Sequence, residues 1–332
     1  MTARSTLLVT RTMTRPRSEQ NRNEMFAAAL DAVVFEVPDG WGERTLVLPS
    51  LDAFDAVVVL LRHEDLFVAP PIDWMGFDGL RVWYEADATA DYWDLWRSRT
   101  SGQYVGAFEP MFRRHGFDHM IVTGSESKAR FADQGIPVTW LPKGYDPDAF
   151  HLVVDPAERS GCCTYGSAYF ARAAMLSDAK RRRISVEHIR ADYRSLNDRL
   201  NAYASGLVCN MIGIPRGGRI GRAIRKVNRG ALLDIRPGPE VMMKNFETAA
   251  AGCAVFADWI EDLGMLGFED GVSFVAYRSF DELWEKLDHY GRNVTDLVAI
   301  ARAGEELCRT RHTWACRADS LKTIVTSLLA KA

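Results

Sequence analysis

The sequence has few of the features that mark metal-binding, membrane or secreted proteins. Its six cysteines contain no C-x-x-C pair, and with seven scattered histidines they give no zinc-ligand spacing. No apolar run approaches the roughly 20 residues that cross a bilayer, and the first residues lack the apolar stretch and cleavage site of a signal peptide. We therefore expect a cytoplasmic protein with no metal, no stable membrane insertion and reduced, buried thiols at Cys162, Cys163, Cys209, Cys253, Cys308 and Cys316.

Net charge is small overall but strongly polarised along the chain. The formal net charge is −3 at pH 7. Residues 171–230 nevertheless contain fourteen Lys or Arg against four Asp or Glu, so the rest of the chain is acidic. This pattern indicates an anionic ligand near the basic segment, which could be a phosphate group, a nucleic acid or the protein's own acidic half.

Short apolar segments separated by helix-like stretches predict an α/β fold. The strand candidates do not alternate with period 2 and are mostly bounded by Gly, Asp or Pro, as is typical of strands buried on both faces. In the first half they are 7–10, 32–37, 56–61, 80–84, 120–123 and 138–141, with helices clearest over 23–30 and 125–133. The repeated strand–helix–strand order favours a parallel, doubly wound sheet.

The second half repeats this rhythm. Its strand candidates are 162–165, 207–212, 254–256 and 272–276, and its helix candidates are 168–177, 246–251, 281–290, 296–307 and 319–329. A turn-rich segment at 143–148 joins the halves. We predict two facing Rossmann-like domains, at 1–150 and 151–332, with a C-terminal helix and a basic insert at about 179–229.

Two strand-to-helix connections in the second half are candidate binding sites, because ligands of open α/β sheets bind beyond the carboxyl ends of strands. The first is Tyr165-Gly166-Ser167, before a helix that carries Arg172. Glycine there lets the backbone approach a phosphate, and the helix N-terminus offers unpaired N–H groups, although such turns are also common structural elements. The second runs from Met242 to Asp258 and contains Glu247, which could equally stabilise the helix N-terminus.

The second stretch resembles the nucleotide-sugar site of glycosyltransferases with the GT-B fold. It has their Phe-Glu pair (Phe246-Glu247), a run of small residues, Gly252 and a short apolar strand. The resemblance implies that Glu247 accepts hydrogen bonds from the ribose of the donor and that the helix N-terminus faces its diphosphate. The implied donor-binding residues are Glu247, Lys244, Asn245, Phe246, Gly166, Ser167, Tyr165, Arg172 and Arg236, and the expected donor is a UDP-sugar.

Other segments match the same family in the same order. Residues 139–150 resemble its interdomain "LP-x-G-x-D-x-x-x-F" segment, and His312-Thr313-Trp314 with Arg317 resembles the CgeB-like branch of the group 1 (family 4-like) glycosyl transferases. Many relatives carry a second glutamate eight positions before the first, where this chain has Pro239 followed by Glu240. The family generally works without a metal, so Arg172, Lys244 and Arg236 are expected to stabilise the leaving diphosphate.

The acceptor hydroxyl is expected to lose its proton to a residue of the first domain. Glu85 and Asp87 follow a buried strand, where active-site loops occur, but acids are also common turn residues there. His115 and His119 are further candidates, with a packing role as the alternative.

The basic insert suggests an acceptor class. Its glycines beside Arg219, Arg222, Arg225 and Lys226 are typical of a loop that contacts a phosphate backbone. The leading hypothesis is therefore a hydroxymethylated base in DNA, as in phage enzymes, with a small molecule, glycan, lipid-linked or protein hydroxyl as alternatives. A non-catalytic nucleic-acid-binding protein on a GT-B scaffold is the alternative of another class, and a cyclase or epimerase with this fold is a third.

Overall fold

The computed structural model describes residues 5–12, 18–38, 46–93, 104–168, 170–210, 212–213, 235–236 and 240–331. The chain divides into two compact units. Unit 1 comprises Met1–Gly144 and Trp314–Ala332, and unit 2 comprises Tyr145–Thr313. This division differs from the predicted domains chiefly at the C-terminus, because the last helix packs in unit 1.

Unit 1 is built on a six-stranded sheet of order β2-β1-β3-β4-β5-β6, in which every pair of neighbours is parallel. The strands are β1 Thr6–Arg11, β2 Val33–Val37, β3 Ala56–Val59, β4 Leu80–Glu85, β5 His119–Val122 and β6 Val138–Trp140. All six coincide with predicted apolar segments. The central strands β3 and β5 are buried along their whole length, which explains why their sequences do not alternate.

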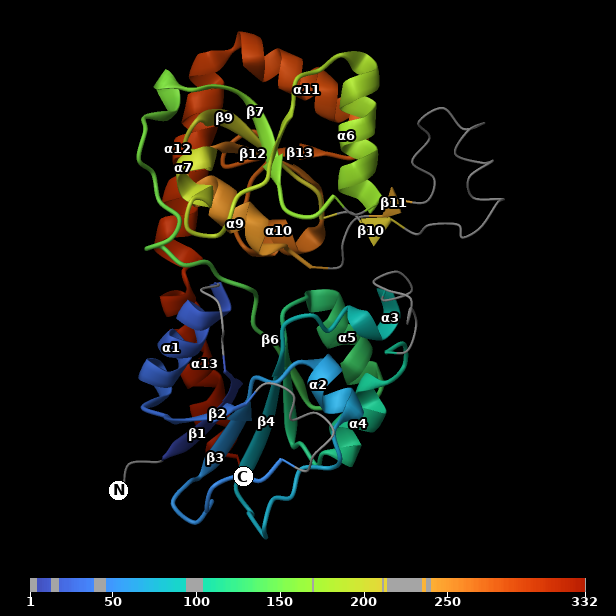
Figure 1. Ribbon diagram of the computed structural model, residues 1–332, viewed down its shortest axis with the longest axis vertical. Helices are drawn as coiled ribbons and strands as arrows, with labels where there is room; N and C mark the ends of the chain where they lie inside the picture. Colours follow the sequence, from blue (N-terminus) through green and yellow to red (C-terminus); the bar gives the residue numbers. More distant parts are fainter. Residues whose placement is uncertain are drawn as a thin grey trace, which may run out of the picture. The chain divides into compact units, whose positions relative to one another are not determined.

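Helices cover both faces of this sheet (Figure 1). They are α1 Ser18–Leu30, α2 His63–Val68, α3 Ala90–Trp93, α4 Phe108–Arg114, α5 Ser125–Asp133 and α13 Trp314–Leu329. Helix α13 lies beside α1, where the Trp314 and Phe26 rings meet edge to face with centroids 6.1 Å apart. Arg317 also donates from Nε to the Lys143 carbonyl oxygen at 3.0 Å. These contacts place the end of the chain in unit 1.

Unit 2 has a five-stranded parallel sheet of order β13-β12-β9-β7-β8. Its strands are β7 Ser160–Tyr165, β8 Glu187–Ile189, β9 Tyr203–Val208, β12 Ala254–Asp258 and β13 Val275–Tyr277. The segment predicted as a strand at 207–212 is mostly the end of β9 and the residues after it. A two-stranded antiparallel ribbon, β10 Ile212–Gly213 with β11 Ile235–Arg236, completes the strands described in this unit.

Among the helices of unit 2, α9 lies unusually close to the sheet. These helices are α6 Phe170–Arg182, α7 Leu196–Leu200, α9 Met243–Ala250, α10 Glu261–Met265, α11 Phe280–Arg292 and α12 Val294–Arg311, with a 3-10 turn at Pro156–Glu158. A Cβ atom at Gly206 in β9 would lie 2.1 Å from Cγ2 of Thr248 in α9. Glycine at this position therefore allows α9, the helix that carries Glu247, to lie directly on the sheet.

Within the described residues, three kinds of feature are not found. No helix there is both long and apolar enough to cross a membrane. No three His, Cys, Asp or Glu side chains of this part gather as a metal site. The six cysteines, all within it, carry thiols rather than disulfides, and all but the half-buried Cys316 are buried.

We predict that Trp314→Ala lowers the free energy of unfolding by about 3–5 kcal/mol, because a large buried aromatic ring is replaced by a cavity. The exposed Lys322 of the same helix supplies the control variant Lys322→Ala, which should change it by less than about 0.5 kcal/mol. Urea titrations followed by circular dichroism measure both. Equal stabilities for the two variants would contradict the assigned role of α13.

Candidate donor site

The candidate donor site lies where the strands of unit 2 end. The carboxyl ends of β7, β9 and β12 are marked by Tyr165, Asn210 and Asp258. Because the strands are parallel, these ends share one edge of the sheet, which we call the donor edge. Helix α9 follows Met242, an N-cap residue whose side chain makes no capping hydrogen bond.

Tyr165 and Glu247 meet at this edge. The Tyr165 hydroxyl donates to Oε2 of Glu247 at 2.5 Å, and both side chains are buried, Glu247 being 5% exposed. Burial and the adjacent carboxylate raise the pKa of Tyr165 well above its ordinary value, so the phenol keeps its proton. The structure thus brings together two of the predicted donor-binding residues from β7 and α9.

Two cations flank the turn after Tyr165. Gly166 has φ of +83°, and a Cβ there would lie 2.7 Å from Cε of Lys244 and 3.7 Å from Nη1 of Arg172. The guanidinium of Arg172 donates to the Ser167 carbonyl oxygen, while its buried Nε has no hydrogen-bond partner among the described residues. The Lys244 ammonium lies 5.4 Å from the centre of the Tyr165 ring. Glycine, left-handed backbone and two cations at one turn suit an anionic group.

His188 is a residue of this edge that the sequence reasoning missed. Its Nε2 donates to the Gly166 carbonyl oxygen at 2.7 Å. It lies in β8, a three-residue edge strand that was not predicted because Glu187-His188-Ile189 contains a single apolar residue. His188 therefore holds the turn from the side of β8.

Asn245 and Phe246 do not face the turn. Asn245 is fully buried and donates from Nδ2 to Oδ1 of Asn210 at 2.8 Å, and the Phe246 ring packs on His312 with centroids 5.0 Å apart. The structure thus gives both residues a role in fixing α9, while their contact with the donor stays a prediction. Helical neighbours point in different directions, and on α9 the residues that approach Tyr165 include Lys244, Glu247 and Thr248.

Asn210 and Asp258 anchor the start of α9, and neither was predicted. The backbone N–H of Asn210 donates to Oδ1 of Asp258 at 2.5 Å, and the side-chain Oδ1 of Asn210 accepts from the backbone N–H of Met242 at 3.3 Å. Burial raises the pKa of Asp258 from its ordinary 3.8 to about 7. The available signal was their position, since Asp258 ends the buried strand β12 and Asn210 lies two residues after the end of β9.

Several predicted residues lie wholly or partly outside the described residues. The backbone of Arg236 pairs with Ile212 in the β10–β11 ribbon, but its side chain is not described. Pro239 is not described either, and Glu240 beside it is buried. Arg219, Arg222, Arg225 and Lys226 all lie outside the described residues.

Comparison with known proteins agrees with this architecture. Residues 220–323 match the family model described as glycosyl transferase-like. Sucrose-phosphate synthase from Thermosynechococcus elongatus has a similar structure, with a TM-score of 0.63 at 10% identity over 99% of this chain and 100% of that chain. The chain has the GT-B glycosyltransferase fold. The predicted α/β fold and the predicted enzyme class, glycosyltransferase, are confirmed at these levels, while the CgeB-like branch stays a prediction.

Other glycosyltransferase-like structures extend the comparison. Anabaena HepE in complex with UDP and glucose has a TM-score of 0.60 at 11% identity, over 97% of this chain and 99% of that chain. A glycosyltransferase from Rickettsia africae has a TM-score of 0.51 at 9% identity, with both chains covered to 100%. No curated protein sequence matches this chain.

In unit 1 of this glycosyltransferase fold, the carboxylates of Glu85 and Asp87 differ in their surroundings. Glu85 is buried and accepts from the backbone amides of His63 and Asp87, each at 2.7 Å. It therefore holds two loops together and is unsuited to take a proton from a substrate. Asp87 is 24% exposed and pairs with Arg62 at 2.7 Å and with Lys143 at 3.6 Å. Of the predicted bases, only Asp87 has solvent access at the carboxyl end of this sheet.

The histidine candidates do not reach this edge. His115 follows α4 and precedes β5, so it lies toward the amino end of the sheet, buried with Nε2 at 2.9 Å from the Leu66 carbonyl oxygen. Burial lowers the pKa of both His115 and His119 to about 4. The structure thus gives His115 a packing role, and its role as a base stays a prediction that this position does not favour. His63, which the sequence analysis did not identify as a candidate, lies nearer to the carboxyl end of the sheet, with its Nδ1 3.4 Å from Oε1 of Glu85.

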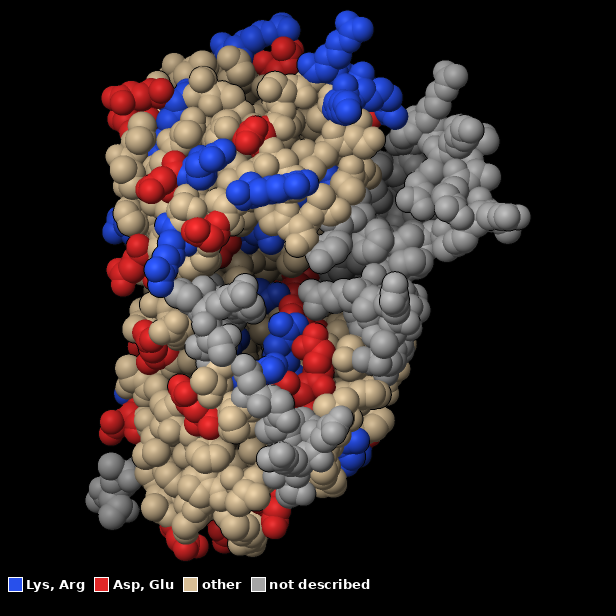
Figure 2. Space-filling model, in the orientation of Figure 1, with Lys and Arg blue, Asp and Glu red and all other residues tan. Residues whose placement is uncertain are grey.

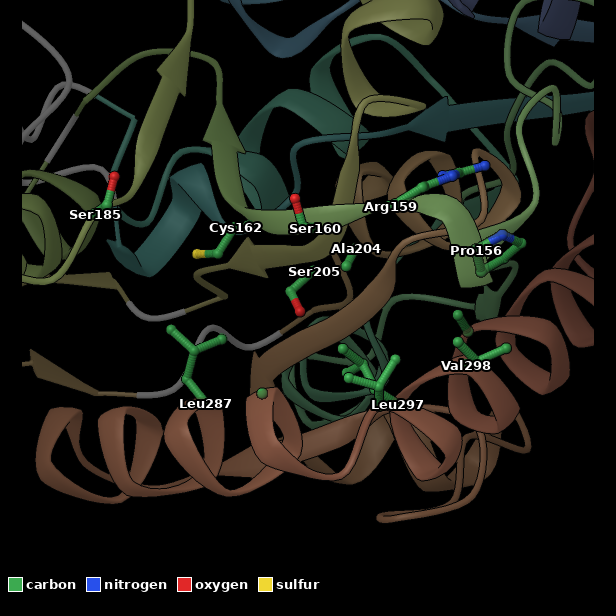
Figure 3. A pocket seen from close by; sticks show the side chains of 14 residues that line it. Pro156, Arg159, Ser160, Cys162, Ser185, Ala204, Ser205, Leu287, Leu297 and Val298 are labelled. Carbon is green, nitrogen blue, oxygen red and sulfur yellow. The ribbon is translucent and has the colours of Figure 1, made fainter.

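A cavity of about 270 Å³ lies elsewhere in unit 2. Cys162 and Ser205 line it from the amino ends of β7 and β9, and Leu287 and Leu297 line it from α11 and α12 (Figure 3). The donor edge is at the opposite ends of the same strands. The cavity is therefore not part of the candidate donor site.

The raised pKa of Asp258 predicts how stability depends on pH. The folded protein retains a proton that the unfolded chain releases near pH 4, so this group stabilises the fold at low pH and that contribution declines up to about pH 7. Relative to Asp258→Asn, wild type should lose about 1 kcal/mol per pH unit across this window and then level off. Urea unfolding of both proteins at a series of pH values measures the difference. A difference that does not vary with pH would contradict the assignment.

Proposed function

We propose that this chain is a metal-independent glycosyltransferase that moves a sugar from a UDP-sugar to an acceptor hydroxyl. The observation that carries the proposal is the convergence of Glu247, Lys244 and Arg172 on the Tyr165–Gly166 turn at the donor edge. The glycosyl transferase-like match over residues 220–323 supports the reaction class. The UDP and glucose bound in the HepE complex support the choice of donor.

Each of these residues has a defined task in the proposed reaction. Glu247 accepts hydrogen bonds from the ribose hydroxyls, as the family resemblance implies. Lys244, Arg172 and the N-terminus of α9 neutralise the diphosphate as the sugar–phosphate bond breaks, and Gly166 allows the backbone to approach it. Two cations at the leaving group supply the charge that a metal would otherwise provide, which supports a metal-independent reaction.

We assign the acceptor to unit 1, with Asp87 taking the proton of the attacking hydroxyl. Its ion pairs with Arg62 and Lys143 hold the carboxylate in place, and its partial exposure lets a substrate reach it.

We also propose a cytoplasmic location for the protein. The six cysteines are present as thiols, which is the form that a reducing compartment maintains.

A hydroxymethylated base in DNA is the proposed acceptor. At the first end of the insert, Lys180, Arg181 and Arg182 form the last turn of α6, and basic side chains gather over that end of the helix (Figure 2). That end is about 20 Å from the donor edge, because α6 rises about 1.5 Å per residue, and Arg182 pairs with Asp178 at 2.9 Å. We propose that the DNA contact is made by Arg219, Arg222, Arg225 and Lys226, whose glycine-flanked sequence suits a phosphate backbone. A small-molecule, glycan or protein hydroxyl is the alternative acceptor, and nucleic-acid binding without transfer is the alternative function.

We predict that Glu247→Ala weakens UDP binding by on the order of 100-fold without unfolding the chain, because two hydrogen bonds to a carboxylate contribute about 1.5–3 kcal/mol each. Isothermal titration with UDP measures the affinity. The exposed Glu261 of the same unit supplies the control variant Glu261→Ala, which should bind as wild type does. Unchanged affinity in Glu247→Ala would remove the proposed site, and failure of wild type to bind UDP or any UDP-sugar would overturn the proposed function.

Neutralising Arg219, Arg222, Arg225 and Lys226 together should flatten the salt dependence of DNA binding. Each lost phosphate contact reduces the slope of log K against log salt by about 0.9. Fluorescence anisotropy with a duplex that carries hydroxymethylated bases gives the slope. Neutralising Lys180, Arg181, Arg182 and Arg183 instead removes the same charge at the far end of α6 and should leave the slope nearly unchanged. If the two quadruple variants behave alike, residues 219–226 are not the DNA contact.

A further inference from the structure

We propose that Tyr165 is the positioning residue that makes the donor site selective for ribose, by orienting the Glu247 carboxylate toward the two ribose hydroxyls. The inference rests on the proposed function, since it concerns how the same site recognises its nucleotide. Tyr165 thus acts on the nucleoside end of the donor through Glu247 and does not contact the substrate itself.

The geometry ties Tyr165 to Glu247 more closely than to any phosphate-binding group. The hydroxyl donates to Oε2 of Glu247 at 2.5 Å in a buried environment, where a hydrogen bond to a charged acceptor is strong. Burial and the carboxylate raise the pKa of the phenol, so the proton remains on the tyrosine and the negative charge on Glu247. With one carboxylate oxygen fixed by Tyr165, the plane and direction of the group are set before a nucleotide arrives.

The ring of Tyr165 has a separate contact with the phosphate-binding end. The Lys244 ammonium lies 5.4 Å from the ring centre, a cation–π distance. A phenylalanine would keep this face and lose only the hydroxyl. Tyr165→Phe therefore separates the orientation of Glu247 from the placement of Lys244.

A fixed carboxylate is a basis for selectivity because its benefit depends on the ligand. A nucleotide with both ribose hydroxyls gains from acceptors that are already oriented. A nucleotide without them gains nothing from that orientation. Loss of the Tyr165 hydroxyl should thus weaken the ribonucleotide and leave the dideoxynucleotide almost unaffected.

The experiment measures the affinities of UDP, 2′,3′-dideoxyuridine diphosphate and inorganic pyrophosphate for wild type and Tyr165→Phe. We expect UDP affinity to fall about tenfold, the dideoxy analogue to change less than about twofold, and pyrophosphate affinity to remain as in wild type. Tyr277→Phe is the matched control, because Tyr277 is also buried, ends the parallel strand β13, and donates its hydroxyl to the Val208 carbonyl oxygen at 3.0 Å. It should leave the preference for UDP over the dideoxy analogue unchanged.

A double-mutant cycle tests whether Tyr165 acts through Glu247. In the Glu247→Gln background, adding Tyr165→Phe should cost less than about twofold in UDP affinity, since the charged group that the hydroxyl orients is already gone. A further tenfold loss in that background would show that Tyr165 acts on its own and would overturn the inference. Equal losses for UDP and the dideoxy analogue in Tyr165→Phe would overturn it as well, because they indicate general damage to the site.

The outcomes separate the inference from the proposed function. If wild type binds UDP and prefers it to the dideoxy analogue, but Tyr165→Phe retains that preference in full, the inference fails while the proposed function stands. If wild type binds UDP without preferring it, Tyr165 has no ribose selectivity to provide and the inference fails. If wild type binds no uridine nucleotide, the proposed function fails and the inference with it.

Discussion

A buried hydrogen bond from the Tyr165 hydroxyl to the Glu247 carboxylate joins the end of a strand to a helix that lies directly on the sheet. A buried carboxylate is costly unless it is paired, so Tyr165 and Glu247 depend on each other. The close approach of α9 at Gly206 and its anchoring through Asn210 keep Glu247 within reach of β7. The placement of Lys244, one turn before Glu247 on α9, follows from the same constraint.

The donor edge therefore consists of two layers. Tyr165, Glu247, Lys244 and Arg172 form the layer that is arranged around the turn at Gly166. Behind them, Asn210, Asp258 and Asn245 connect strand ends to the start of α9 and are buried. His188 of β8 stabilises the turn by a hydrogen bond to the Gly166 carbonyl oxygen. Groups that bind a reacting ligand need such support, because a small displacement of a charged side chain weakens a charge-assisted hydrogen bond strongly.

Local sequence pattern was sufficient for most of the fold and for part of the site. The inner strand β3 is a continuous apolar run buried along its whole length, as strands covered on both faces require, whereas the edge strand β2 is apolar but mostly exposed. The pattern at 319–329 identified a helix but not the sheet that it covers, which depends on contacts such as Trp314 with Phe26. Phe246 appeared in a motif with Glu247, yet adjacent helical positions face different surroundings. His188 and Asn210 approach the site only through the pairing of strands distant in sequence.

Hydrogen–deuterium exchange of the wild-type chain with and without UDP tests the central claim most directly. The account predicts that UDP slows amide exchange in two separate segments, the turn after β7 at residues 165–168 and the first turn of α9 at residues 243–247, because both face the bound nucleotide. Protection confined to other parts of unit 2, such as the amino ends of β7 and β9 beside the cavity, would contradict the assignment of the donor site to the Tyr165–Glu247 pair.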